Sequence, residues 1–248
     1  MRLKKSLGQH FLRDRKVIER IANAVDITPE DFVVEIGPGG GALTEEILKR
    51  SPKKLFLVEI DPYWADYLKN KFGEKVEVFN EDATKFNFSL LGKNLKFFGN
   101  LPYNVSTRIL RNLLNHRNAL SEGVFMVQKE VADRLTSKGG KEYGYLPALL
   151  QNFFSFEKLF NVHPKAFLPP PKVNSTVFKV KRLPFDMEEE EILEFESFLK
   201  RAFSKRRKKL KGNLKGLNLG DYGEKRAEEL SPKELLNLFY SLKERGEL

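Results

Sequence analysis

Residues 32–41 read FVVEIGPGGG, an apolar run followed by four glycines within five residues. The run 32–36 predicts a buried strand, and residues 42–50 predict a helix. Glycines at such a junction let the backbone turn tightly, and they let a ligand approach the N-terminus of the helix. This stretch therefore predicts the first strand, loop and helix of an α/β sheet, with a ligand site at the end of the strand.

Short strands and helices continue to alternate on both sides of this stretch. Further strands are predicted at 54–59, 76–79, 96–99, 123–127, 156–162 and 175–181, and helices at 14–26, 61–72, 106–115, 129–137 and 145–154. This order predicts an α/β fold with a seven-stranded, mostly parallel sheet that is covered on both faces. The last two strands have no helix between them, so we expect that pair to be antiparallel.

The pattern becomes purely helical after Leu183-Pro184, which is typical of a linker. Helices are predicted at 188–203 and 231–245, and the second begins with the capping-box arrangement Ser-Pro-Lys-Glu. We therefore expect two domains. Residues 1–183 would form the α/β domain with a basic N-terminal segment, and residues 184–248 a small all-α domain.

Composition narrows the class of protein. The chain has 248 residues, no cysteine and three histidines, so disulfides and cysteine-zinc sites are excluded and we expect no metal centre. No apolar run approaches the roughly 18 residues of a membrane span, and residues 1–12 lack the apolar core of a signal peptide. We expect a cytoplasmic, monomeric protein. The net charge of +10 favours a polyanionic partner, most often nucleic acid.

Within the C-terminal segment, the basic residues are concentrated in one run. Residues 200–215 carry nine basic residues and no acid. Such a run is often only a solvated surface. In a chain that also carries a site for modifying a base, contact with RNA phosphates would be the better interpretation. The predicted contacts are Lys205, Arg206, Arg207 and Lys208.

Two carboxylates follow the next strands of the predicted sheet. Glu59 ends the second strand, 22 residues after Gly37, and it could accept hydrogen bonds from both ribose hydroxyls of an adenosine-containing cofactor. Asp82 follows the third strand and could accept from the adenine amine. The glycine loop alone suits NAD and S-adenosylmethionine equally well. No downstream residues mark a hydride-transfer site, so a dehydrogenase is the weaker alternative.

The fourth strand is followed by Asn100-Leu101-Pro102-Tyr103. An adenine amine is a poor nucleophile, because its lone pair is delocalised into the ring. The Asn100 side-chain oxygen and the Leu101 carbonyl could accept from its two hydrogens, and Tyr103 could stack on the base. Catalysis would then consist of positioning and electrostatics, without a strong general base. A bare Asn-x-Pro-Tyr would more often be an ordinary turn, but its place after the fourth strand favours the amine site.

Taken in order, the motifs resemble those of the KsgA family of ribosomal RNA dimethyladenosine transferases. The matching blocks are residues 5–12, 34–39, 58–61, 81–83, 100–107, 125–132 and 167–175. The resemblance implies a Rossmann-like, class I S-adenosylmethionine-dependent methyltransferase domain with a small helical domain. The implied substrate is a pair of adjacent adenosines in the hairpin loop near the 3′ end of 16S rRNA, in the small ribosomal subunit or its precursor. Each adenosine would be methylated twice on N6.

The resemblance also implies roles for single residues. The implied cofactor contacts are His10, Leu12, Gly37, Glu59, Asp82 and Asn100. Leu101, Pro102 and Tyr103 would shape the base pocket, and Phe167 would stack on the flipped base from the other side. One position departs from the pattern, because bacterial relatives usually have asparagine in place of His10.

Two other functions stay open on the sequence. The Erm type of enzyme modifies an adenine in large-subunit RNA, although Asn104-Val105-Ser106-Thr107 and the Phe167 loop favour the small-subunit type. A non-catalytic RNA-binding assembly factor could use the same fold, and that role could coexist with catalysis.

Overall fold

A seven-stranded sheet forms the centre of the computed structural model, which describes residues 9–248. Its strands are β2 (Phe32–Ile36), β3 (Lys54–Val58), β4 (Glu77–Phe79), β5 (Leu95–Asn100), β6 (Leu120–Gln128), β7 (Phe154–Val162) and β9 (Ser175–Arg182). Their order is β4-β3-β2-β5-β6-β9-β7. The pairs from β4 to β6 are parallel, and β9 is antiparallel to β6. The predicted mostly parallel, seven-stranded sheet is confirmed.

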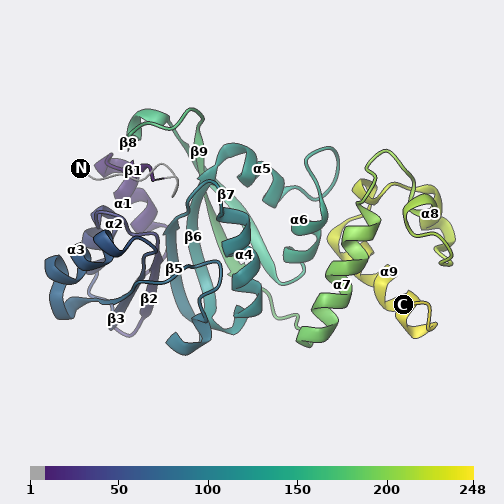
Figure 1. Ribbon diagram of the computed structural model, residues 1–248, viewed down its shortest axis with the longest axis horizontal. Helices are drawn as coiled ribbons and strands as arrows, with labels where there is room; N and C mark the ends of the chain where they lie inside the picture. The colour runs from purple at the N-terminus through teal and green to yellow at the C-terminus, as the bar shows by residue number, and fades with distance from the viewer. Residues whose placement is uncertain (1–8) are drawn as a thin grey trace. The chain divides into compact units, whose positions relative to one another are not determined.

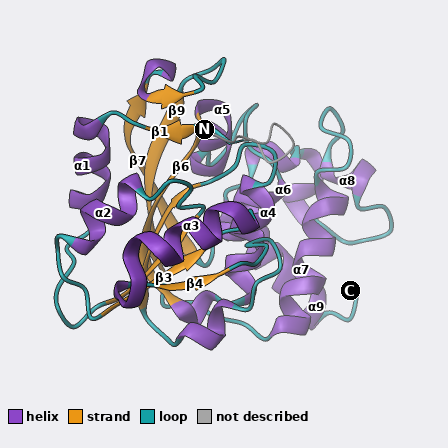
Figure 2. Ribbon diagram, turned by 60° about the vertical axis from the view of Figure 1, so that its left-hand side comes forward, coloured by secondary structure: helices purple, strands orange, loops and turns teal. Residues whose placement is uncertain are grey.

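Helices cover both faces of this sheet (Figure 2). On one side lie α1 (Arg15–Asn23), α2 (Ala42–Leu48) and α3 (Pro62–Phe72), and on the other α4 (Ser106–Asn115). Successive side chains of β5 lie on opposite faces of the sheet, as the two-residue period of a strand requires. Phe98 joins the core cluster under α1, α2 and α3. Phe97 packs edge-on against Phe88, with the ring centroids 5.5 Å apart.

A short antiparallel pair ties the N-terminal segment to a loop far along the chain. β1 (Phe11–Leu12) pairs with β8 (Phe167–Leu168), as Figure 1 shows. The amide of Arg13 extends the contact by donating to the Ala166 carbonyl at 2.8 Å. Neither strand was predicted from the sequence, because two residues are too few to show a strand period. The pair fixes residues 11 and 12 beside the edge of the sheet where β2 ends.

The chain divides into two compact units, and the division differs from the predicted domain boundary. The first unit runs to Ala132 and resumes over Phe156–Arg182, whereas the second comprises Asp133–Ser155 and Leu183–Leu248. The segment 133–155 was predicted as part of the α/β domain. Its helix α6 (Tyr145–Leu150) packs instead against α7 (Glu189–Ala202) and α9 (Pro232–Glu244) of the second unit. The break also falls within α5 (Lys129–Thr136) and within β7.

Aromatic packing and polar contacts hold the second unit together. Phe195 of α7 and Phe239 of α9 have ring centroids 5.1 Å apart. The Asn152 amide, in the segment that was assigned wrongly, donates to the Pro232 carbonyl at 3.3 Å. The predicted capping box at the start of α9 is confirmed, because Ser231 Oγ accepts from the Glu234 amide at 3.1 Å and the Glu234 carboxylate accepts from the Ser231 amide at 2.8 Å.

Candidate active site

The ends of four neighbouring strands meet at one cavity in the first unit. It encloses about 680 Å³ of empty space, its open mouth included, which is the size of a small-molecule site. Its lining includes predicted site residues from five separate parts of the chain: His10, Gly37, Glu59, Asp82, Asn100, Leu101, Pro102 and Tyr103. The structure therefore brings together residues that were predicted from separate motifs.

Two positions of the loop after β2 require glycine. Gly37 has a φ of +66°, and a Cβ added there would lie 3.0 Å from the Asn100 carbonyl oxygen. Gly39 has a φ of +54°, and a Cβ there would lie 3.0 Å from the Phe11 ring. Side chains other than hydrogen would therefore be strained at both positions and would push away neighbouring groups. Both glycines line the cavity, where they present backbone rather than side chains.

The Glu59 carboxylate is buried and held by two backbone amides. Its Oε2 accepts from the Gly39 amide at 3.0 Å, and its Oε1 accepts from the Asp61 amide at 3.1 Å. Burial raises the pKa of this carboxyl, and the two backbone hydrogen bonds oppose the rise. Each oxygen can accept a further hydrogen bond, so the group can still receive the two hydroxyls of a ribose.

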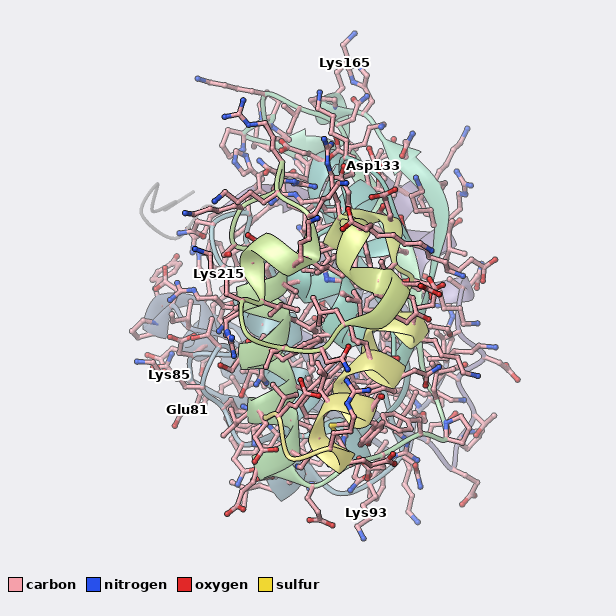
Figure 3. The ribbon with its side chains drawn as sticks, turned by 90° about the vertical axis from the view of Figure 1, so that its right-hand side faces the viewer. Glu81, Lys85, Lys93, Asp133, Lys165 and Lys215 are labelled. Carbon is pink, nitrogen blue, oxygen red and sulfur yellow. The ribbon has the colours of Figure 1, made fainter. Side chains whose placement is uncertain are left out.

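One oxygen of the Asp82 carboxylate accepts hydrogen bonds from its own loop. Its Oδ1 accepts from the Thr84 amide at 2.9 Å and from the Thr84 hydroxyl at 2.7 Å. These bonds fix the carboxylate at the cavity wall and leave Oδ2 available to an amine donor. The neighbouring Glu81 also lines the cavity, but its side chain projects outward, as does that of Lys85 (Figure 3).

The Asn100 side chain is oriented by the N-terminal segment. Its Nδ2 donates to the His10 carbonyl at 3.1 Å, so its Oδ1 faces away from that carbonyl. The following residue, Leu101, is buried, and its amide donates to the Met126 carbonyl at 3.0 Å. The loop thus presents a side-chain acceptor whose direction is set by a contact 90 residues away in the sequence.

Tyr103 is fixed at both ends of its side chain. Its hydroxyl lies 2.7 Å from Ser175 Oγ, and its ring stacks on the His10 ring at a centroid distance of 5.2 Å and an angle of 24°. His10 Nδ1 lies 2.9 Å from the Pro169 carbonyl oxygen. Burial raises the pKa of the Tyr103 hydroxyl. The group is therefore a neutral aromatic wall for the cavity.

Leu12 and Phe167, which were predicted to contact the cofactor and the base, lie outside this cavity. Phe167 is 3% exposed, pairs with Leu12 and packs in the core cluster, so its ring would have to leave this packing to stack on a base, and the stacking role stays a prediction. The pairing of β1 with β8 holds Phe167 in this buried position. Leu12 lines an adjoining cavity of about 860 Å³, together with Gly37, Gly39 and Asn100, which both cavities share.

Sequence reasoning also gave Phe11 no role. Its ring covers Gly39 and packs edge-on against Trp64, with the centroids 4.9 Å apart. Phe11 follows His10 in the motif 5–12, of which residues 5–8 lie outside the described part of the chain. That motif was the one signal that could have revealed this packing.

The predicted RNA-binding residues belong to the second unit. Lys205, Arg207 and Lys208 are exposed. Arg206 is committed to the protein, because its guanidinium donates to the Tyr143 carbonyl at 2.7 Å and pairs with Glu228 at 3.6 Å. Within the same run, Arg206 therefore has a structural role, whereas the other three side chains are exposed to solvent.

The described residues contain neither a metal site nor a membrane-spanning helix. Within residues 9–248, no group of three or more His, Asp or Glu side chains could hold a metal ion. No helix in that range combines the length and the apolar character needed to cross a membrane.

A buried acid beside the glycine loop leads to the first prediction. Glu35 is 2% exposed, and burial raises its pKa to about 8, although the Thr44 hydroxyl donates to it at 2.5 Å. The folded protein then keeps a proton that the unfolded chain releases above pH 4.5. Folding stability should therefore fall as the pH rises from about 5 to 8.

Glu35→Gln should flatten this dependence, because glutamine keeps an acceptor for Thr44 and does not titrate. Urea unfolding of the wild type and of the variant at pH 5 and pH 8 measures the effect. A wild-type stability that is equal at the two pH values, or that rises, would contradict the prediction.

Two solved structures share the architecture just described. The dimethyladenosine transferase from Plasmodium falciparum has a TM-score of 0.81 and 27% identity, over 96% of this chain and 98% of that one. The 23S rRNA methyltransferase ErmE has a TM-score of 0.74 and 26% identity, over 94% and 99%. By fold and site, the protein is an α/β methyltransferase of the type that includes these enzymes.

The family follows from the sequence comparisons. The model of the ribosomal RNA adenine dimethylase family matches residues 1–238, and the chain belongs to this family. It is 41% identical over 256 residues to the ribosomal RNA small subunit methyltransferase A of Chlorobium chlorochromatii, covering 98% of this chain and 95% of that protein. The protein of the same name from Laribacter hongkongensis is 40% identical over 257 residues, covering 98% and 97%.

Proposed function

We propose that the protein dimethylates the N6 amines of two adjacent adenosines in the hairpin loop near the 3′ end of 16S rRNA, with S-adenosylmethionine as methyl donor. The observation that carries this proposal is the Asn100–Tyr103 loop, which lies in one cavity with the glycine loop and Glu59. The small-subunit target rests on relatives about 40% identical over nearly the full length, whose names specify that subunit.

The residues present fit an adenosine-containing cofactor. Gly37 and Gly39 line the cavity with backbone, at positions where a Cβ would strike the Asn100 carbonyl oxygen and the Phe11 ring. Glu59 offers carboxylate oxygens to ribose hydroxyls, and Asp82 Oδ2 suits an adenine amine. The sulfonium of S-adenosylmethionine supplies an electrophilic methyl group when it is bound. Because the two cavities share Gly37, Gly39 and Asn100, together they can accommodate an elongated ligand.

Asn100 and Leu101 act on the target amine. An amine whose hydrogens point to Asn100 Oδ1 and to the Leu101 carbonyl is drawn toward tetrahedral geometry, which frees its lone pair for attack. Tyr103 holds the plane of the base by stacking. A monomethylated amine keeps one N–H and can use one acceptor, so the same loop can serve both methylations.

The base must leave its stack to reach this loop. A hairpin loop lowers the cost of flipping, because its bases are incompletely paired and stacked. The exposed Lys205, Arg207 and Lys208 are suited to contact phosphates of the RNA.

The basic run gives a second prediction. Replacing Lys205, Arg207 and Lys208 together with alanine should weaken binding to small subunits by about tenfold. The slope of the logarithm of the binding constant against the logarithm of the salt concentration should also become shallower, by up to the amount expected for about three phosphate contacts. Arg206→Ala should instead lower the unfolding temperature by a few degrees, since it removes the contacts to Tyr143 and Glu228. Filter binding at several salt concentrations and thermal unfolding measure the two effects. A triple variant with an unchanged salt slope would contradict the assignment.

Methylation of isolated subunits tests the proposed target. Unmethylated small and large subunits are incubated with the protein and labelled S-adenosylmethionine, and the modified adenosines are mapped by mass spectrometry. We expect dimethylation at two adjacent adenosines of the small subunit. Modification of large-subunit RNA alone would support the Erm type. Calorimetry with S-adenosylmethionine and NAD in parallel tests the cofactor, and tight binding of NAD alone would overturn the proposal.

A further inference from the structure

His10 makes three contacts, and two of them are to residues on the target side of the cavity. Its carbonyl accepts from Asn100 Nδ2 at 3.1 Å, which orients the Asn100 amide. Its ring stacks on Tyr103 at a centroid distance of 5.2 Å. Its Nδ1 lies 2.9 Å from the Pro169 carbonyl oxygen, which holds the ring in place. Asn100 and Tyr103, which His10 contacts, are both assigned above to the target base.

We propose that the His10 ring is a positioning residue for the target adenine, acting by holding Tyr103 in the orientation that receives the base. This inference rests on the proposed function and goes beyond the cofactor role that the family resemblance implies for position 10. Ser175 anchors the Tyr103 side chain at its hydroxyl end, which leaves the ring free to tilt about that end. The His10 ring restrains the plane of Tyr103, because a stacked pair resists tilting of either ring.

The backbone and the side chain of His10 have separable effects. Any residue at position 10 can supply the carbonyl that orients Asn100, so a substitution there leaves this contact in place. Only a planar ring can stack on Tyr103. An asparagine at position 10 would keep the first contact and lose the second. The ring is therefore the part of His10 whose contribution a substitution can isolate.

Three variants separate ring stacking from cofactor binding. His10→Ala and His10→Asn remove the ring, whereas His10→Phe keeps a ring that can stack and removes the Nδ1 contact to Pro169. For each variant we measure kcat and KM with unmethylated small subunits, the Kd for S-adenosylmethionine by calorimetry, and thermal unfolding. If the ring positions the base through Tyr103, kcat should fall about tenfold in the alanine and asparagine variants, the scale expected for loss of one stacked aromatic pair. The phenylalanine variant should retain kcat within about threefold.

The KM for small subunits and the Kd for S-adenosylmethionine should stay within about twofold in all three variants. If the Kd rises about tenfold in every variant while kcat holds, His10 is a cofactor ligand and the inference is overturned. If phenylalanine fails to rescue kcat in a variant that unfolds at the wild-type temperature, the stacking role is also overturned. A wild-type protein that does not methylate small subunits would refute the proposed function itself, which is a separate outcome of the same experiment.

Discussion

Asn100→Ala is expected to lower the rate of methyl transfer to small subunits by about 10²- to 10³-fold, the usual cost of removing one preorganised polar group from an active site. The variant loses the acceptor Oδ1 and also the donor that binds the His10 carbonyl. The target amine would then have only the Leu101 carbonyl to draw it toward tetrahedral geometry. Single-turnover methylation at saturating S-adenosylmethionine measures the effect on the chemical step.

Two variants control for this result. Asn115→Ala removes an exposed asparagine at the end of α4, whose Oδ1 accepts from Arg111, and it should leave the rate within about twofold. Asn100→Asp keeps an acceptor but sets a carboxylate against the His10 carbonyl, so it should lie between the wild type and Asn100→Ala. Full activity of a folded Asn100→Ala variant would show that the amine is not held in this way.

The sequence was a good guide to the sheet because its strands are long enough to show a pattern. The run 32–36, for example, combines apolar residues with a glycine loop and a helix, and it appears in the structure as β2 with the same bounds. β1 and β8 each have two residues and depend on each other across more than 150 positions. No local pattern predicts such a pair. The assignment of 133–155 was wrong for a related reason, since its partners α7 and α9 come later in the chain.

The candidate site shows the same limit at the level of single residues. Glu59 and Asn100 were predicted because they end strands, and the ends of neighbouring parallel strands meet at one edge of the sheet. Phe167 was given a stacking role by its motif, but its burial depends on β1. Arg206 could not be distinguished from Arg207 in a basic run, because its partners at Tyr143 and Glu228 are distant in sequence. The sequence therefore predicts which residue types lie at the ends of the strands. It does not predict which side chains from distant segments will contact them.

Glu59→Gln is expected to weaken binding of S-adenosylmethionine by about 100-fold, equivalent to about 2.7 kcal/mol. The Glu59 carboxylate accepts from the amides of Gly39 and Asp61 with its two oxygens. A glutamine has one oxygen, and its NH₂ group would face one of these N–H donors. A buried donor left without an acceptor costs about 1–3 kcal/mol, and the ribose would also lose a charged acceptor. The glycine loop and the cofactor would thus be affected by the same substitution.

Calorimetry and ligand-dependent thermal unfolding measure this effect independently of activity. Saturating S-adenosylmethionine should raise the unfolding temperature of the wild type and shift that of Glu59→Gln much less, because stabilisation by a ligand follows its concentration relative to Kd. Glu77→Gln is the matched control, since Glu77 is an exposed acid at the start of β4 that pairs with Lys54 at 2.7 Å. It should bind the cofactor as the wild type does. Equal Kd values for Glu59→Gln and Glu77→Gln would mean that the ribose is not bound at Glu59, and the cofactor would then have to lie elsewhere in the two cavities.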